Sequence, residues 1–168
     1  VGQVARDQWA RRIEKCGVPR RLSDGRRARW AILGLGKLGG REMNYHSDVD
    51  LVFLFDEDGR TDGPPGASNE RFFADLAQRV IRDLGGSAES GALYRVDTRL
   101  RPYGGSGPLA VPLDAFRAYF AGPAQTWERL ALTRARVLFA TGTFGREVTN
   151  AIREALTRPG IDAGKIAS

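Results

Sequence analysis

The stretch LGLGKLGGREMNYHSDVDLVFLFD, residues 33–56, contains two patterns that point to different chemistry. The first is G-x-G-x-x-G at Gly34, Gly36 and Gly39, followed by the acidic residue Asp56 at the distance expected of a dinucleotide-binding fold. The second is Ser-Asp-Val-Asp at the start of an apolar run, where paired carboxylates could hold divalent cations against phosphates. The spacing of the neighbouring elements separates the two interpretations.

The connection after the glycines is too short for a dinucleotide-binding fold. That fold needs a full crossover helix between two parallel strands, but only eight residues separate Gly39 from Asp48, and Asn-Tyr-His-Ser among them is poor helix. The glycine pattern alone is a weak signal, because 21 of the 168 residues are glycine. We therefore predict two neighbouring strands, joined by a loop and one helical turn that begins at Gly39 and Gly40.

Asp48 and Asp50 are two residues apart at the start of the clearest strand, predicted over residues 48–55. A period of two places both side chains on one face, where two like charges repel each other and lose solvation. Magnesium or manganese between them would offset this cost, since both cations take carboxylate oxygens and keep water for substrate phosphates. The competing interpretation is that both side chains lie at an exposed strand end and face water.

A third carboxylate, Asp97, lies inside another predicted strand over residues 92–100. If the two strands are adjacent, Asp97 lies beside Asp48 and Asp50 on one face of the sheet. Three carboxylates can hold two divalent ions, one on a triphosphate tail and one that lowers the pKa of an attacking oxygen. This arrangement predicts nucleotidyl transfer by in-line displacement at the α-phosphorus.

Residues near these carboxylates are predicted to contact phosphate. The glycine pair allows close backbone approach and leaves N–H groups free near a helix N-terminus, although a plain tight turn would use the same residues. A lysine adds a point charge, a serine hydroxyl adds a hydrogen bond, and arginine forks match phosphate oxygens. Arg99 and Arg101 follow Asp97 at steps of two, so we expect them to continue its face of the strand. The predicted phosphate contacts are Lys37, Gly39, Gly40, Ser47, Arg99 and Arg101.

The chain as a whole predicts an α+β fold, with helices packed on a mixed sheet and further helices after it. Predicted helices cover residues 1–15, 69–84, 112–121, 126–140 and 144–156, and predicted strands cover 30–33, 48–55 and 92–100. Asn69 is predicted to cap the second of these helices, and residues 56–68 are predicted to form an exposed loop. We divide the chain into an N-terminal helix and basic linker (1–28), a catalytic core (29–111) and a helical C-terminal part (112–168), expected to be truncated from a longer parent chain.

Composition indicates a globular protein with an anionic partner. Hydrophobic residues make up 42% of the chain, and the net charge is +6. No apolar run approaches the roughly 20 residues that cross a bilayer, no signal-peptide pattern is visible, and Cys16 is the one cysteine. We expect a cytoplasmic protein that binds neither membrane nor nucleic acid, because the basic residues lie among the carboxylates. A non-catalytic nucleotide- or RNA-binding module is the alternative.

Three blocks of sequence resemble the glutamine synthetase adenylyltransferase family, whose members attach AMP to glutamine synthetase and remove it. The blocks are GLGKLGGREMNYHSDVDLVFLFD, LYRVDTRLRPYGGSGPLAV and TWERLALTRARVL, in the family's order, and together they cover roughly residues 30–140. The resemblance implies a nucleotidyltransferase fold of the DNA polymerase beta type. The pattern of that fold is matched at Gly39, Gly40, Ser47, Asp48, Asp50 and Asp97.

The resemblance also implies substrates and partners. One catalytic head of the family's long chain transfers AMP from ATP to a tyrosine of glutamine synthetase, and the other removes it with phosphate, releasing ADP. The expected cofactor is Mg²⁺ (or Mn²⁺), and the expected base toward the tyrosine hydroxyl is Asp97. The expected partners are glutamine synthetase and, through the parent chain, a signalling protein of the nitrogen pathway.

Two parts of the sequence differ on which head the chain represents. Residues 128–136 resemble the adenylylating half, which we favour, whereas residues 94–97 and 107–109 are reminiscent of the removing half.

The helix predicted over residues 126–140 carries three weaker site candidates at i, i+6 and i+8, which suggests an inward polar face, although a salt-bridged helix surface would look the same. These candidates are Glu128, Arg134 and Arg136.

Overall fold

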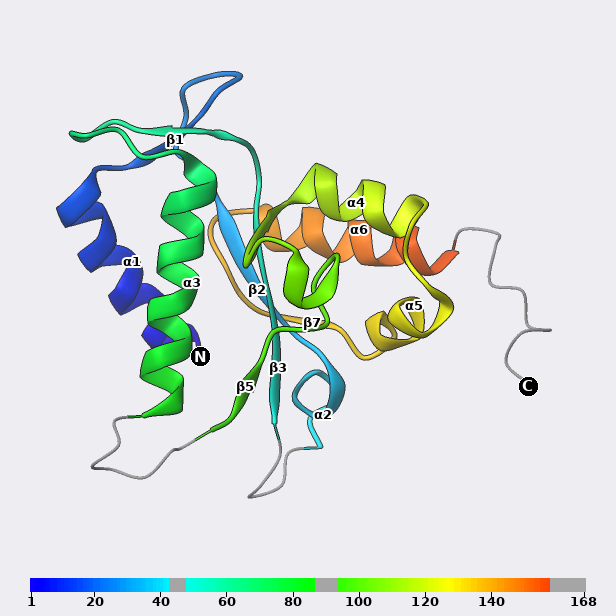
Figure 1. The fold of residues 1–168 in the computed structure, drawn as a ribbon. Coiled ribbons are helices and arrows are strands. Elements are labelled where there is room, and N and C mark those ends of the chain that lie inside the picture. Colours follow the sequence, from blue (N-terminus) through cyan, green and yellow to red (C-terminus); the bar gives the residue numbers. More distant parts are fainter. Residues whose placement is uncertain (43–47, 87–93, 158–168) are drawn as a thin grey trace.

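The computed structural model describes residues 1–42, 48–86 and 94–157. A mixed five-stranded sheet lies between two helical layers (Figure 1). One face is covered by α1 (Gly2–Cys16) and α3 (Asn69–Gly85), and the other by α4 (Leu113–Ala121), α5 (Thr126–Leu132) and α6 (Phe144–Thr157). The predicted α+β class, with a mixed sheet and packed helices, is confirmed.

The sheet has the strand order β5 (Val96–Asp97), β3 (Val49–Phe55), β2 (Trp30–Gly34), β7 (Arg136–Ala140), and β6 (Ala110–Pro112) also pairs with β3. Strand β2 runs antiparallel to β3 and β7, whereas β5 and β6 run parallel to β3. Because β2 occupies one edge of β3, the short strands β5 and β6 share the other edge at different heights. A separate two-stranded sheet consists of β1 (Pro19–Arg21) and β4 (Gly59–Thr61).

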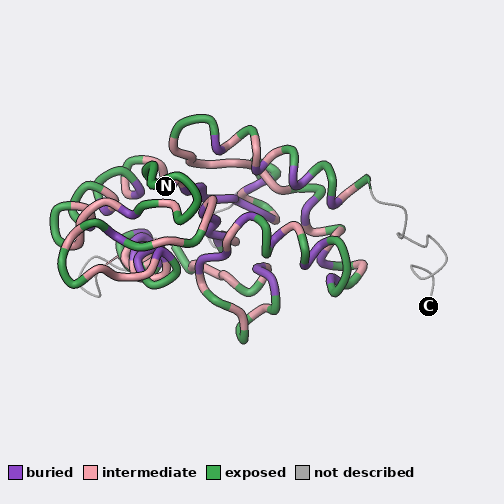
Figure 2. Tube along the Cα trace, turned by 90° about the horizontal axis from the view of Figure 1, so that it is seen from above, coloured by how far each residue is buried: buried purple, intermediate pink, exposed green. Residues whose placement is uncertain are grey.

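Strand β3 supplies both hydrophobic cores, because its side chains alternate between the two faces of the sheet. Val49, Leu51 and Phe53 pack with α1 and α3, whereas Val52 and Leu54 pack with α4, α5 and α6. Figure 2 shows the buried strands running through the centre of the molecule. Asp50 lies two residues before Val52 on the same strand, so its side chain is on the face covered by the C-terminal helices.

Helix α1 is held on α3 by aromatic rings and by polar pairs. Trp9 of α1 stacks on Phe73 of α3, with ring centroids 6.0 Å apart. Arg12 Nη2 donates a hydrogen bond to Asp75 at 2.5 Å, and the Arg12 guanidinium lies 5.6 Å from the ring centroid of Phe72. The N-terminal segment is thus part of the folded unit.

The start of α3 differs in detail from the prediction that Asn69 caps it. Ser68 is the N-cap, because its hydroxyl accepts a hydrogen bond from the Arg71 N–H at 3.3 Å. Asn69 is fully buried, and its Nδ2 donates to the carbonyl oxygens of Arg20 and Glu57, both at 2.9 Å. The residue that we predicted to cap the helix instead joins the loops around β1 and β4.

The helix predicted over residues 126–140 is confirmed at its start and wrong at its end. Helix α5 ends at Leu132, the chain turns, and residues 136–140 form the edge strand β7 beside β2. The β-forming sequence Val-Leu-Phe at 137–139 fits this strand, and pairing with β2 satisfies backbone groups that a longer helix would have left on an open sheet edge.

The strand predicted over residues 92–100 is also shorter in the structure. Its described part forms a strand only at Val96–Asp97. The next residues turn, because the carboxylate of Asp97 accepts a hydrogen bond from the Arg99 N–H at 2.8 Å. Residues 59–61, predicted as loop, form β4.

Candidate active site

Strands β2 and β3 are antiparallel, and the described residues between them include one helical turn, α2 (Gly36–Gly39). Antiparallel neighbours need no crossover helix, so the prediction of two adjacent strands joined by a short turn is confirmed. The dinucleotide-binding interpretation fails here. Asp56, which would have contacted the ribose, instead accepts hydrogen bonds from the backbone N and the Nε of Arg29, both at 2.9 Å.

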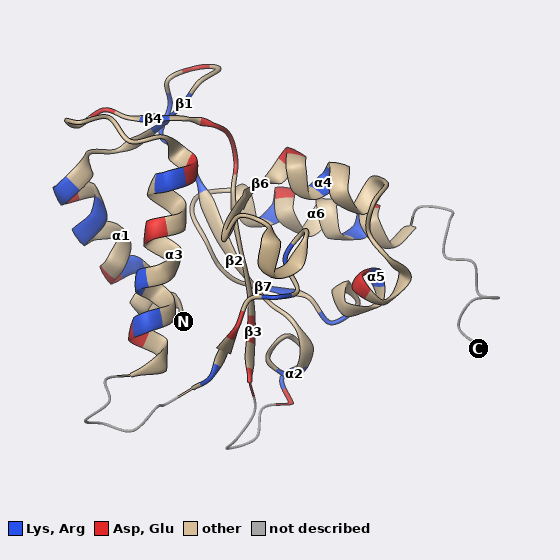
Figure 3. Cartoon of the chain, viewed as in Figure 1, with Lys and Arg blue, Asp and Glu red and all other residues tan. Residues whose placement is uncertain are grey.

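Asp50 and Asp97 are register partners on the parallel strands β3 and β5. Register partners project from the same face of a sheet, and Asp48 shares this side because it precedes Asp50 by two residues. Figure 3 shows the acidic parts of β3 and β5 side by side, at the end of the sheet where α2 lies. The predicted neighbour relation between Asp50 and Asp97 is confirmed.

The carboxylates have unlike electrostatic environments. Burial, followed by the charges of Asp97 and Asp48, raises the pKa of Asp50. The opposite holds for Asp97, whose pKa is lowered chiefly by its hydrogen bonds with Arg99, at 2.9 Å from Nε and 2.5 Å from Nη2. Asp48 is more exposed and lies 3.9 Å from the Nε of Arg95. Asp50 is therefore the least compensated of the three.

The three carboxylates can be compared with the ligands that a divalent cation requires. Among the described residues, no group of three or more His, Cys, Asp and Glu side chains forms a ready-made metal cage. However, carboxylate oxygens are the donors that Mg²⁺ and Mn²⁺ prefer. Burial, followed by the charges of Asp97 and Asp48, raises the pKa of Asp50, and a cation beside it would relieve both effects. The donor set fits a hard cation, provided that Arg99 releases the Asp97 carboxylate.

The glycines of the turn serve close packing. Gly36 has a φ of 54°, and a methyl group on it would overlap Oδ2 of Asp50. A methyl group on Gly39 would overlap the carbonyl oxygen of Arg134. These two contacts fix the turn against β3 on one side and against the segment before β7 on the other.

The prediction that Gly39 and Gly40 open a helical turn with free N–H groups is wrong. They lie at the C-terminal end of α2, and their N–H groups donate to the carbonyls of Leu35 and Gly36. The N–H groups without an intrahelical acceptor belong to the first turn, which starts at Gly36. Lys37 is exposed there, and Ser47 lies outside the described residues.

Arg99 and Arg101 do not continue one strand face, since the chain has already turned. Arg101 is buried, and its guanidinium donates to carbonyls of its own loop, including those of Thr98 at 2.8 Å, Gly107 at 3.1 Å and Pro108 at 3.0 Å. Its donors are occupied, so in this structure it organises the loop after Asp97. Arg99 is exposed and contacts Asp97 alone of the three carboxylates by hydrogen bonds.

The three weaker candidates do not share a helix face, so that prediction is wrong. Arg136, on β7, donates to the carbonyls of Leu38 at 3.1 Å and Gly39 at 3.3 Å, and thus caps the C-terminal end of α2. Arg134 pairs with Glu42 at 2.9 Å, just beyond the same turn.

Glu128 is buried at the start of α5. Its carboxylate accepts hydrogen bonds from Tyr119 Oη at 2.7 Å and from the Gln125 N–H at 2.8 Å, which completes a capping box. Burial and the bond to Glu128 raise the pKa of Tyr119 to about 12. Glu128 therefore connects α4 to α5 and is placed for structure.

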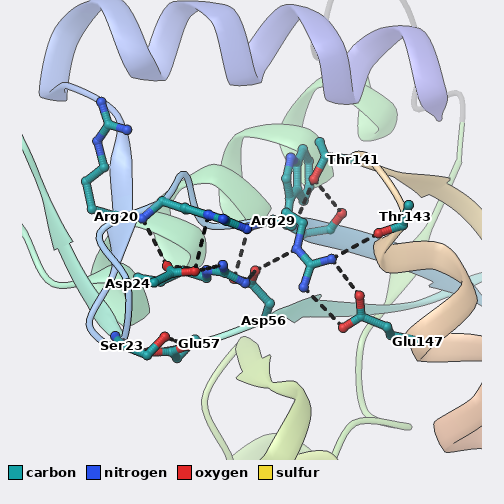
Figure 4. Close-up of polar contacts among 12 residues, drawn as sticks. Arg20, Ser23, Asp24, Arg29, Asp56, Glu57, Thr141, Thr143 and Glu147 are labelled. Carbon is teal, nitrogen blue, oxygen red and sulfur yellow. Dashed lines mark hydrogen bonds and ion pairs between the residues drawn. The ribbon is translucent and has the colours of Figure 1, made fainter.

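A second polar cluster, which the sequence did not predict, lies at the other end of β3 (Figure 4). Arg29 links the buried carboxylate of Asp56 to Glu147 of α6, with Nη1 2.5 Å from Glu147, and to Thr143 at 3.2 Å. The cluster connects β2, β3 and α6, and its charges are paired. It stabilises the fold away from the three carboxylates.

Comparison with known proteins agrees with this geometry. The sequence model of the family described as glutamate-ammonia ligase adenylyltransferase matches residues 1–151. The chain belongs to this family. The resemblance noted from the three sequence blocks is confirmed, and the nucleotidyltransferase fold expected from it agrees with the mixed sheet and packed helices.

Similar proteins of the family share the same printed name, bifunctional glutamine synthetase adenylyltransferase/adenylyl-removing enzyme. The protein of Thioalkalivibrio sulfidiphilus is 40% identical over 168 residues, which is 100% of this chain and 17% of that protein. That of Methylococcus capsulatus is 45% identical over 131 residues, or 78% of this chain and 14% of that protein. The chain thus spans about a sixth of the length of these relatives. No described helix is both long and apolar enough to cross a bilayer.

Proposed function

We propose that this chain is a nucleotidyltransferase domain that transfers AMP from ATP to a tyrosine hydroxyl of glutamine synthetase. A bond forms between the tyrosine oxygen and the α-phosphorus, the bond to the bridging oxygen breaks, and pyrophosphate leaves. The register pair Asp50–Asp97, with Asp48 two residues earlier, is the observation that carries the proposal. The relatives' names supply glutamine synthetase as the substrate.

Asp48, Asp50 and Asp97 would hold Mg²⁺ or Mn²⁺, which when bound neutralises phosphate charge. The first turn of α2 lies beside Asp50, because Gly36 packs against its carboxylate. We assign contacts with phosphate oxygens to the first N–H groups of this turn and to the exposed Lys37. Arg99 is available for the same task once it leaves Asp97, because its guanidinium is exposed.

The tyrosine proton must pass to a base. We predict Asp97 for this role, although its pair with Arg99 lowers its pKa and makes it a poor proton acceptor until that pair opens. Ser47 stays a predicted phosphate contact, and a cytoplasmic location and control by a nitrogen-signalling protein through the parent chain stay part of the proposal.

Removal of AMP is the second candidate function. In that direction phosphate attacks the same phosphorus, the tyrosine hydroxyl is released and ADP leaves. Two segments are reminiscent of the removing half. Residues 94–97 contain β5 with Asp97, and residues 107–109 receive hydrogen bonds from Arg101, which organises the loop after Asp97. Both directions need the same carboxylates, so the residue assignments hold for either.

The test runs both directions in parallel. The chain is incubated with glutamine synthetase, Mg²⁺ and labelled ATP, and separately with adenylylated glutamine synthetase and phosphate. Label on the protein supports transfer, and ADP release supports removal. Asp48→Asn and Asp97→Asn should abolish whichever activity is present while the circular dichroism spectrum stays unchanged. Full turnover in both variants would refute the site.

A further inference from the structure

A cavity of about 550 Å³ lies at the opposite end of α3 from β5, away from the three carboxylates (Figure 1). It is bounded by the end of α1, by β4 and by the first turn of α3. Its charged lining residues are Arg12, Arg60, Arg71 and Asp75. Nothing in the proposed nucleotidyl transfer uses this space, which has the size of a site for a small organic ligand.

The charges of the lining favour an anion. Three arginines against one aspartate leave two net positive charges, which match the charge of a phosphate monoester near neutral pH. Arg60 and Arg71 are exposed residues of the lining, and Arg60 donates a hydrogen bond to the carbonyl of Gly66. Two guanidinium groups in one lining suit bidentate binding of phosphate oxygens.

Arg12 provides an independent indication of a ligand. Its side chain is only 9% exposed, and it lines the cavity wall. Asp75 takes Nη2, and among the described residues no hydrogen-bond acceptor contacts Nη1. Buried guanidinium donors are normally satisfied, so an acceptor inside the cavity would complete a set of hydrogen bonds that the protein leaves unfinished.

The backbone adds to the positive potential. The cavity wall includes Ala67 and Ser68, which lead into α3, a helix of 17 residues. The N–H groups of its first turn and the positive end of its dipole favour negative charge at this place.

We propose that this cavity binds the phosphate group of a small organophosphate, with Arg60 and Arg71 as ligands and Arg12 as the buried base of the site. The cavity volume leaves room for an organic portion beyond the phosphate. This site is separate from the nucleotidyl-transfer site and does not depend on the function proposed for it.

The test is an NMR titration of ¹⁵N-labelled chain with inorganic phosphate at constant ionic strength, repeated with acetate. Phosphate should shift the amides of Gly66, Ala67 and Ser68, and acetate should do so far more weakly. Arg60→Gln and Arg71→Gln, made singly, should each weaken the phosphate Kd at these amides about tenfold. Arg82→Gln is the matched control, since Arg82 is an exposed arginine of the same helix that does not line the cavity.

Three outcomes would overturn the proposal: shifts confined to α2 and β5, equal binding of acetate, or an unchanged Kd in both variants. The first would locate phosphate at the nucleotidyl-transfer site instead. Because the amide shifts are assigned to individual residues, a negative result at this cavity does not contradict the proposed enzymatic function. In the same way, a failure of the enzymatic proposal does not contradict phosphate binding at this cavity.

Discussion

Arg99 holds the carboxylate of Asp97 through Nε, 2.9 Å from Oδ2, and Nη2, 2.5 Å from the same oxygen, while its backbone N–H donates to Oδ1 at 2.8 Å. Both carboxylate oxygens of the third acid are therefore engaged by one residue. Any cation at this site has to compete with the guanidinium. Arg99 is exposed, so it can leave without breaking other contacts.

This competition predicts opposite effects of Arg99→Ala on metal binding and on catalysis. Affinity for Mn²⁺, measured by electron paramagnetic resonance without nucleotide, should rise several-fold, because Asp97 is released. Turnover should fall, because a phosphate contact is lost. Arg95→Ala is the control, since Arg95 lies 3.9 Å from Asp48 and makes a weaker pair. A fall in Mn²⁺ affinity in Arg99→Ala would contradict the competition.

The unlike pKa values of Asp50 and Asp97 predict stability changes of opposite sign. The folded-state pKa of Asp50 is raised above its ordinary value of 3.8. Its contribution to stability is therefore favourable below pH 3.8 and is lost as the pH rises through the folded pKa. The folded-state pKa of Asp97 is lowered. Its contribution to stability is therefore present above pH 3.8 and is lost as the pH falls through the folded pKa.

At pH 7 without metal, Asp50→Asn should therefore raise the Tm and Asp97→Asn should lower it, while both variants lose activity. The two differences from the parent should shrink toward zero as the pH approaches the acid range, where the carboxyls are protonated in both states. Thermal unfolding followed by circular dichroism between pH 3 and pH 7 measures this. Shifts of the same sign at pH 7 would show that the assigned environments are wrong.

Much of the fold could be predicted from local pattern. The alternation in β3 and the three- and four-residue spacing in α3 each reflect one buried face, and a buried face leaves its period in the sequence. The neighbour relation of Asp50 and Asp97 was also predictable, because two isolated carboxylates in apolar strands are costly unless they act together.

The misplaced features depend on contacts between distant segments. Residues 136–140 form a strand because β2 has an open edge, and nothing near them in the sequence reports that edge. Arg101 was expected to contact phosphate and Arg136 was a weaker site candidate, but backbone carbonyl groups occupy their donors. A guanidinium binds a carbonyl and a phosphate through the same N–H groups, so the sequence alone could not separate the two uses.

Arg101 predicts a stability effect that separates it from Arg99. It is buried with its donors on carbonyls of residues 98–108, so Arg101→Ala leaves several acceptors without partners. We expect a loss of about 2–3 kcal/mol in the free energy of unfolding, from urea titration. Arg101→Lys should not restore it, because an ammonium cannot reproduce the fork. Arg99→Ala, two residues away and exposed, removes only the pair with Asp97 and should cost clearly less than Arg101→Ala; equal losses would contradict the structural role of Arg101.

The neighbouring glycines of the turn predict unequal tolerance to a methyl group. In Gly39→Ala the new Cβ would overlap the Arg134 carbonyl oxygen and approach that of Gly34 to 2.6 Å, and both are backbone atoms that cannot move alone. In Gly40→Ala the nearest atom is 3.3 Å away and the backbone already has a φ of −74°, which alanine adopts freely. Gly39→Ala should therefore displace α2 from β7, lower the Tm by several degrees and abolish activity, whereas Gly40→Ala should keep the Tm and most of the activity. Loss of activity in Gly40→Ala at an unchanged Tm would instead indicate that this glycine contacts the nucleotide directly, and equal Tm values for both variants would contradict the close packing at Gly39.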